Sequence, residues 1–151
     1  MLLVAAGRIP NSDQLQVQAA GIATDARGNI TVDQYGRTSA PGVWALGDIN
    51  GRHQLKHMAN GEAKVVQHNL IHPEDLQTYD DRPAPHAVFT SPQIGAIGLT
   101  EAQAKASGRP YVSVIHDYAG AAYGWAMEDT TSFCKLIADP VTRKLLGAHV
   151  I

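Results

Sequence analysis

The sequence contains a single cysteine, Cys134, among its 151 residues. One thiol cannot form a disulfide within the chain, which excludes a disulfide-stapled secreted domain and favours a reducing, cytoplasmic location. Aromatic residues make up only 6% of the chain and charged residues 17%, and the formal net charge is −2. Because there is no excess of basic residues, neither a nucleic acid nor an anionic membrane is an expected partner.

Long apolar runs are missing as well. No stretch approaches the roughly 20 apolar residues that cross a bilayer, and Met1 leads directly into "LLVAAG" without the basic segment of a signal peptide. The 44% of hydrophobic residues is typical of a globular protein with one ordinary or two small domains. Since strand-like segments stand at both ends, at 2–7 and 144–151, we expect the chain to be a piece of a longer protein.

Hydrophobic periodicity and turn residues predict the elements of the first half. They predict a short buried strand at 2–7, a short helix that ends at Gly21, and strands at 28–33 and 43–46. A long helix is predicted from about Gln54 to His72, because apolar residues recur there on one face. The residues of this face are Leu55, Met58, Ala59, Ala63, Val66 and Leu70.

The polar segment 72–85 contains three prolines and is the predicted linker. After it the sequence becomes dense in strands, with a short helix at 100–108 that Thr100 caps and Gly108 ends. The predicted strands are "HAVFT", "IGAIGL", "YVSVIHDY", "SFCKLIAD" and "KLLGAHVI". The predicted fold class is therefore α+β, with an antiparallel sheet in the part that follows about residue 82.

The stretch "VWALGDIN" (43–50) presents Asp48 directly after a glycine, a few residues before the long helix. Ligands of sheet proteins favour the carboxyl ends of strands, and a helix N-terminus offers unpaired N–H groups and about +0.5 charge. A carboxylate in this position can accept hydrogen bonds from a polyol chain such as that of a flavin. The spacing alone leaves a simple turn open as the alternative.

Four motifs then stand in one order: "AAGRIPN" (5–11), "TSAPGVWALGDI" (38–49), "LKHMANGEA" (55–63) and "VFTSPQIGAIGLTEAQA" (88–104). Together they resemble the pyridine nucleotide–disulfide oxidoreductases, flavoenzymes that use FAD and NADPH or NADH. The resemblance implies that residues 1–8 end an NAD(P)-binding domain and that 9–82 form the second, C-terminal part of an FAD-binding domain. Residues 83–151 would form an incomplete interface domain that makes the parent protein a homodimer.

The resemblance also assigns roles by position. Asp48 is expected to bind the ribityl chain of FAD, and Gly7 to contact the nicotinamide cofactor through its backbone. Ala87, in the first strand of the interface domain, is expected to approach the nicotinamide. Four consecutive residues are expected near the flavin pyrimidine: Gln54, Leu55, Lys56 and His57.

No catalytic residue of the family is expected in this chain, which has no second cysteine for the redox-active pair. His72 and Pro73 imitate the family's His-Pro-x-x-x-Glu motif, but Gln77 stands where its glutamate belongs. The chain alone is therefore predicted to be inactive. Within the family, "DYAGAAYGWAMEDTT" (117–131) resembles the mycothione reductases, whose substrate is mycothiol disulfide. A segment of a dihydrolipoamide dehydrogenase-like enzyme and a non-catalytic dimerisation or binding module remain alternatives.

Several other residues are given structural roles. No metal site is predicted, because the two histidine pairs at 53/57 and 68/72 lie roughly 16 Å apart along the helix at 1.5 Å per residue and lack a third ligand. Cys134 is expected to be a buried structural thiol. Tyr118, Tyr123 and Trp125 are expected to pack an interface, with a substrate pocket as the alternative.

Overall fold

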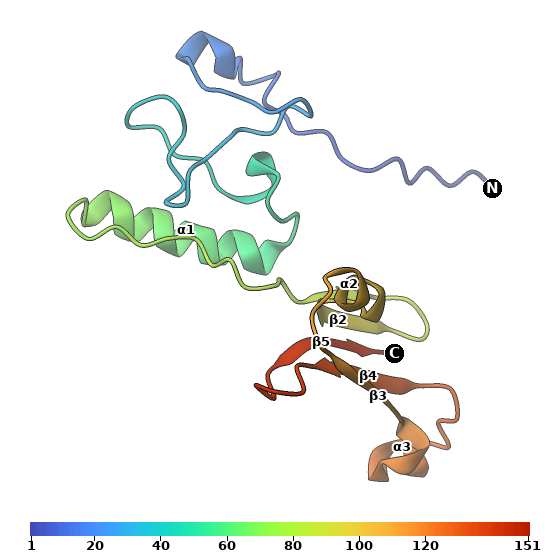
Figure 1. Ribbon diagram of the computed structural model, residues 1–151. Helices are drawn as coiled ribbons and strands as arrows, with labels where there is room; N and C mark the ends of the chain where they lie inside the picture. Colours follow the sequence, from blue (N-terminus) through green and yellow to red (C-terminus); the bar gives the residue numbers. More distant parts are fainter. The chain divides into compact units, whose positions relative to one another are not determined.

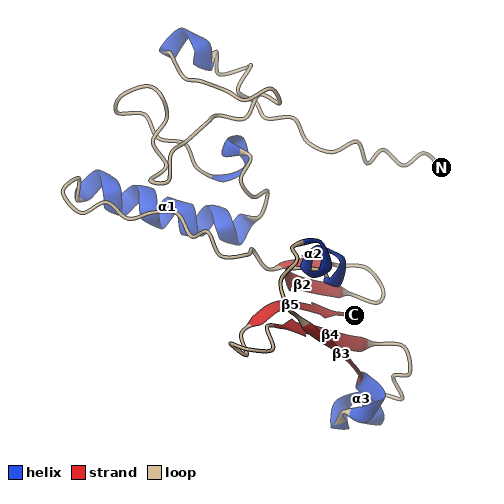
Figure 2. Cartoon of the chain, viewed as in Figure 1, coloured by secondary structure: helices blue, strands red, loops and turns tan.

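The computed structural model describes all 151 residues and divides into two compact units, Met1–Arg82 and Pro83–Ile151. The first unit holds one long helix among turns and loops, and all the strands belong to the second unit (Figure 1 and Figure 2). Residues 72–85, the predicted linker, contain neither helix nor strand. None of the helices has both the length and the apolar character needed to cross a membrane.

A small apolar core organises the first unit. Its members are Val17, Ile22, Ile30 and Ala45, with Val32, Ala40 and Ile49 packed against them. Val17 begins a 3-10 helix, η1 (Val17–Ala20), which ends at Gly21 in the left-handed conformation with φ 71°. Glycine adopts this conformation without steric cost. The observed helix is shorter than predicted but ends at the predicted residue.

The three strands predicted in this unit are absent. Residues 2–7 pair with no other segment, and Leu2 and Leu3 are 88% and 82% exposed. The segments 28–33 and 43–46 contribute one isolated bridge each, at Ile30 and Trp44. These predictions are wrong because a strand needs a pairing partner along its length, and an apolar run supplies none by itself.

Helix α1 (Lys56–Ile71) confirms the predicted long helix to within two residues at each end. Its buried face differs from the prediction, because Glu62 and Asn69 are buried while Ala63 and Leu70 are exposed. The neighbouring loops present backbone N–H and C=O groups to this face. Polar side chains on the helix can bond these groups, whereas apolar side chains would leave them unsatisfied.

The second unit is a five-stranded antiparallel sheet. Its strands are β1 (His86–Val88), β2 (Ile94–Gly98), β3 (Val112–Asp117), β4 (Phe133–Ala138) and β5 (Leu145–Val150). Their order across the sheet is β1-β2-β5-β4-β3. The α+β fold class and the strands predicted after the linker are confirmed.

Helix α2 (Glu101–Ala106) begins and ends as predicted. Thr100 Oγ1 accepts a hydrogen bond from the Gln103 N–H, and the Gln103 side chain accepts one in return from the Thr100 N–H at 2.8 Å. Gly108 follows the helix with φ 68°. The Glu101 carboxylate pairs with Lys135 of β4, so a side-chain ion pair ties α2 to the sheet.

Apolar side chains are exposed on the edge strand β3 and around helix α3 (Ala122–Ala126), which follows the short turn η3 (Tyr118–Gly120). Val114 and Ile115 of β3 and Tyr123 and Trp125 of α3 are all more than half exposed. Cys134 in β4 is half-buried, so it is more accessible than the buried thiol that was predicted. The four apolar side chains of β3 and α3 named here are thus left largely in contact with water.

Candidate cofactor site

The loop that carries Asp48 is one short 3-10 helix, η2 (Gly47–Asn50). Gly47 before Asp48 and Gly51 after Asn50 have φ values of 76° and 70°, in the left-handed region that favours glycine. The Gly51 N–H donates to the Asp48 carbonyl oxygen at 3.2 Å. A tight turn bounded by two glycines therefore replaces the strand end that the sequence predicted here.

Asn50, and not Asp48, uses its side chain to close this turn. Asn50 Oδ1 accepts a hydrogen bond from the Arg52 N–H at 2.9 Å. The Asp48 carboxylate is exposed and makes neither a hydrogen bond nor an ion pair within the chain. Both of its oxygens are thus available to accept hydrogen bonds from a ligand.

Asp48 lines a hollow of about 350 Å³ together with the "GRIPN" turn. The lining residues are Arg8, Ile9, Pro10, Asn11, Asp48, Ile49 and Gln54. Arg8 and Gln54 also line a neighbouring hollow of about 510 Å³, to which Arg27 contributes. The carboxylate, amide and guanidinium groups supply both acceptors and donors, a combination that suits a ligand with hydroxyl and anionic groups.

Of the predicted site residues, Asp48 and Gln54 line the same hollow. Leu55 is the half-buried N-cap of α1, and no side chain caps the helix, while Lys56 and His57 stand exposed in its first turn. Gly7 is exposed with φ 85°, and a Cβ at this position would meet nothing within 4 Å. Ala87 is exposed in β1 of the second unit. The cofactor roles of these residues stay predictions.

A buried carboxylate that the sequence analysis did not identify holds the Asp48 turn. Glu62 Oε2 accepts hydrogen bonds from the Gly47 N–H at 2.6 Å and from Asn50 Nδ2 at 2.9 Å. The Arg52 Nε atom lies 3.9 Å from Glu62 Oε1. One feature of the sequence could have pointed to Glu62. Its carboxylate lies within the apolar stripe of the helix, four residues after Met58 and four before Val66.

Tyr79, from the polar segment after α1, supports the same loop. Its hydroxyl donates to the Ala45 carbonyl oxygen at 3.0 Å, and the Arg52 guanidinium lies 5.3 Å from the centre of its ring. Burial and the nearby Glu62 charge raise the pKa of Tyr79 to about 12, although Arg52 opposes them. Tyr79 therefore keeps its proton, and with it this hydrogen bond, throughout the physiological pH range.

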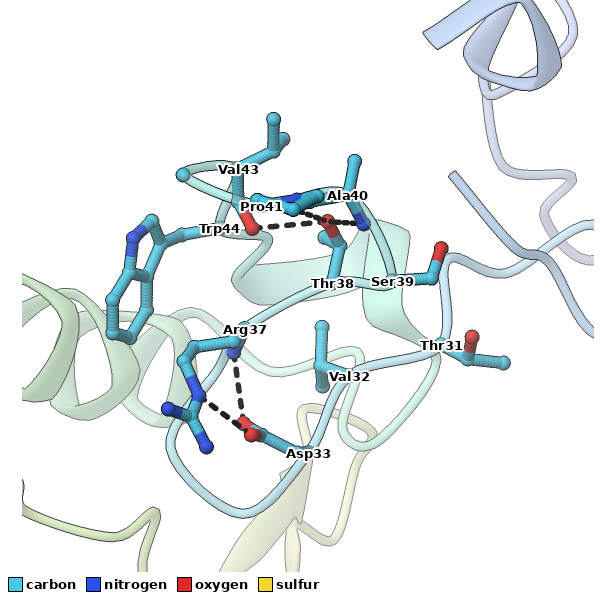
Figure 3. A pocket seen from close by; sticks show the side chains of 11 residues that line it. Thr31, Val32, Asp33, Arg37, Thr38, Ser39, Ala40, Pro41, Val43 and Trp44 are labelled. Atoms are coloured by element: carbon cyan, nitrogen blue, oxygen red, sulfur yellow. Dashed lines mark hydrogen bonds and ion pairs between the residues drawn. The ribbon is translucent and has the colours of Figure 1, made fainter. Parts of the chain in front are cut away.

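Another hollow of the first unit, of about 630 Å³, is less suited to a ligand (Figure 3). In it the Asp33 carboxylate accepts hydrogen bonds from the N–H groups of Tyr35 and Arg37 and from Arg37 Nε. Partial burial would raise the pKa of Asp33, but these hydrogen bonds outweigh it and lower that pKa. The Thr38 hydroxyl donates to the Val43 carbonyl oxygen at 2.9 Å. The charged and hydroxyl groups named here are thus already hydrogen-bonded within the turn, which makes the hollow less suited to a ligand.

No three His, Cys, Asp or Glu side chains are grouped as the ligands of a metal ion would be. The rings of His68 and His72 lie 4.9 Å apart. His68 Nε2 hydrogen-bonds the Asp75 carbonyl oxygen at 2.8 Å, and His72 Nδ1 lies 3.4 Å from Glu74 Oε1. These ring nitrogens are therefore engaged by neighbouring oxygens at the end of the helix.

Comparison with known families accounts for both units. The family model described as pyridine nucleotide-disulphide oxidoreductase matches residues 1–63, and that described as its dimerisation domain matches residues 84–151. The two matches leave only residues 64–83 unassigned. The chain belongs to the pyridine nucleotide-disulphide oxidoreductase family.

The sequence identity of the chain to individual members of the family differs from one member to another. Mycothione reductase from Mycobacterium tuberculosis (strain H37Rv) is 52% identical over 155 aligned positions, which cover 100% of this chain and 34% of that protein. Dihydrolipoyl dehydrogenase from Cupriavidus necator is 35% identical over 99% of this chain and 31% of its own length. The solved structure of the HOCl-induced flavoprotein disulfide reductase RclA from Escherichia coli matches with a TM-score of 0.88 and 33% identity, over 99% of this chain and 34% of that one. The chain thus spans about a third of the length of these relatives.

Proposed function

We propose that this chain supplies the ribityl side of an FAD site and the dimerisation domain of a flavoprotein disulfide reductase. The observation that carries the proposal is the Asp48 carboxylate, which is exposed, unused by its own chain, and in one hollow with Arg8 and Gln54. An ionised carboxylate only accepts hydrogen bonds, as the hydroxyls of a ribityl chain require. When bound, FAD accepts hydride from NADPH or NADH and passes electrons to a disulfide.

The start of α1 is proposed to face the flavin pyrimidine, which becomes negatively charged on reduction. The first N–H groups of the helix have no capping side chain, and the helix dipole adds about half a positive charge there. The residues proposed for this contact are Gln54, Leu55, Lys56 and His57. Gly7, which has no side chain, would allow the nicotinamide to approach its backbone, and Ala87 would contact the nicotinamide from the dimerisation domain.

Mycothiol disulfide is the proposed substrate of the whole protein. The supporting observation is that the chain is 52% identical to mycothione reductase but 35% identical to dihydrolipoyl dehydrogenase over nearly the same residues. The redox-active cysteine pair is not within these 151 residues, which contain only Cys134. The exposed apolar side chains of β3 support a homodimer, since a second copy would remove them from water.

The proposal is tested in a chimera in which residues 1–151 replace the aligned third of the Mycobacterium tuberculosis mycothione reductase. Asp48→Ala removes a hydrogen bond to a charged acceptor worth about 1.5–3 kcal/mol, so FAD affinity should fall roughly 10- to 150-fold. Asp48→Asn keeps one acceptor oxygen and should lose less. Affinity is measured by titrating the apoprotein with FAD and following the quenching of flavin fluorescence.

Asp33→Ala is the matched control, because the Asp33 carboxylate bonds only within its own turn. This variant should lower the melting temperature of the chimera and leave FAD affinity within about twofold. If Asp48→Ala folds normally and binds FAD as tightly as the unmodified chimera, the ribityl role is wrong.

A further inference from the structure

The cofactor role proposed for Asp48 requires its carboxylate to point in one direction, and the turn that carries it cannot ensure this alone. Within η2, the closing backbone hydrogen bond is the 3.2 Å contact between Gly51 and Asp48. Hydrogen bonds of 3-10 geometry are poorer than those of an α-helix. The glycines at both ends, Gly47 and Gly51, add freedom rather than restraint.

We propose that Glu62 is a positioning residue for Asp48. Its buried carboxylate binds the turn on both sides of Asp48, through the Gly47 N–H at 2.6 Å and Asn50 Nδ2 at 2.9 Å. Both hydrogen bonds end on the same oxygen, Oε2. The backbone of the turn therefore cannot reorient at Asp48 without breaking one of them, and the direction in which the Asp48 side chain leaves the backbone is held. This inference rests on the proposed FAD site.

The environment of Glu62 suits a rigid support. The residue is 5% exposed, and hydrogen bonds to a carboxylate are shorter and stronger than neutral ones. Arg52 places a positive charge 3.9 Å from its other oxygen and is itself held by Asp81 at 2.8 Å and by the ring of Tyr79. The carboxylate is thus compensated in charge, as a buried ion requires, without competition for the oxygen that holds the turn.

Asn69 provides a matched control on the same helix. It is 1% exposed, and like Glu62 it binds loop groups from the buried face of α1. Its partners are the carbonyl oxygens of Tyr35 and Gln77 and the Gln77 N–H, so it does not touch the Asp48 turn. Loss of Asn69 should destabilise the unit as loss of Glu62 does, but should not redirect Asp48.

The test uses FAD titration of the chimera defined above, at a temperature where each variant is shown to be folded. Glu62→Gln keeps an acceptor oxygen but loses the charge, and should weaken FAD binding roughly 3- to 10-fold. Glu62→Ala should weaken it further, and Glu62→Gln carries the test if the alanine variant does not fold. Asn69→Ala should change FAD affinity by less than about twofold.

A double-variant cycle separates positioning from general support. If Glu62 acts through Asp48, Glu62→Gln should change FAD affinity by less than about twofold in a chimera that already carries Asp48→Ala. The positioning role would be overturned if Glu62→Gln weakened FAD binding equally with and without Asp48→Ala, or if it caused no loss in the chimera that retains Asp48. It would also be overturned if Asn69→Ala caused as large a loss as Glu62→Gln. Full FAD affinity of Asp48→Ala alone would instead refute the proposed site, so the two failures are distinguishable.

Discussion

At the scale of single residues, buried polar side chains hold the loops of the first unit through hydrogen bonds to the backbone. Tyr79 is 3% exposed and donates a hydrogen bond to the backbone of Ala45. Its ring lies against Gly36, which has φ 89° and where an added Cβ would collide with the Tyr79 hydroxyl. The contact therefore depends on both residues, a tyrosine that keeps its proton and a glycine that leaves room for it.

The raised pKa of Tyr79 predicts a loss of stability in alkaline solution. In the unfolded chain a tyrosine loses its proton near pH 10, whereas in the folded chain Tyr79 loses it near pH 12. The free energy of unfolding should be unaffected by this group below pH 10. It should fall between about pH 10 and 12, by at most about 3 kcal/mol.

Urea unfolding followed by Trp44 fluorescence, with Trp125 replaced by Phe, reports on the first unit at each pH. Tyr79→Phe cannot ionise, so its stability should fall less over this range than that of the parent chain. Other alkaline titrations are common to both proteins and cancel in the difference. Parallel pH profiles for the two proteins would show that Tyr79 is not protected from ionisation.

The sequence could propose Asp48 and Gln54 as candidate cofactor residues, a role that stays a prediction, but it could not point to the residues that hold the Asp48 turn. Asp48 and Gln54 were predicted from the order of the sequence motifs, and in the structure both line one hollow. Glu62 and Tyr79 act on backbone groups of loops. The paths of these loops depend on glycines with positive φ, such as Gly47, which leave no trace in hydrophobic periodicity.

At the scale of elements, predictions succeeded where a segment's requirements are local or its partner is in the chain. The cap residue of helix α2 was sufficient to predict where the helix begins. Strands β2, β4 and β5 pair with one another within the chain, and Ala148 lies opposite both Ile97 and Leu136. The apolar segment 2–7 has the composition of a strand but no partner. Strand formation is non-local, so composition alone cannot distinguish the two cases.

The capping box of α2 predicts a measurable contribution to the second unit. Thr100→Ala removes the side-chain oxygen that accepts from the Gln103 N–H, which should lower the free energy of unfolding by about 1 kcal/mol. Thr100→Ser keeps the oxygen and should cost less than half of that. Denaturant unfolding followed by Trp125 fluorescence, with Trp44 replaced by Phe, measures both. Equal stability of all three proteins would show that the cap contributes nothing.

At the scale of the whole molecule, the two units contribute different parts of the proposed enzyme. The first holds the residues proposed to contact the flavin, and the second holds the antiparallel sheet that the dimerisation-domain model matches. The chain spans about a third of the length of its relatives, so we expect most of the contacts of a bound cofactor to come from outside these 151 residues.

The 151-residue chain alone should therefore bind FAD negligibly. Binding carries a cost in translational and rotational freedom, and the few contacts available around Asp48 cannot offset it. Titration of FAD with the purified chain should give no saturable quenching of flavin fluorescence up to about 100 μM protein, a concentration that would half-saturate a site with a binding free energy of roughly 5.5 kcal/mol. Saturation in the micromolar range would place most of the binding energy in this third of the protein.

The most direct test of the Asp48 assignment is a crystal structure of the FAD-bound chimera, in which one distance decides. The account predicts that an Asp48 carboxylate oxygen lies about 2.5–3.0 Å from a ribityl hydroxyl oxygen, the range of an O–H···O hydrogen bond. A ribityl chain whose nearest hydroxyl is more than about 3.5 Å from Asp48, with the carboxylate directed to solvent, would contradict it.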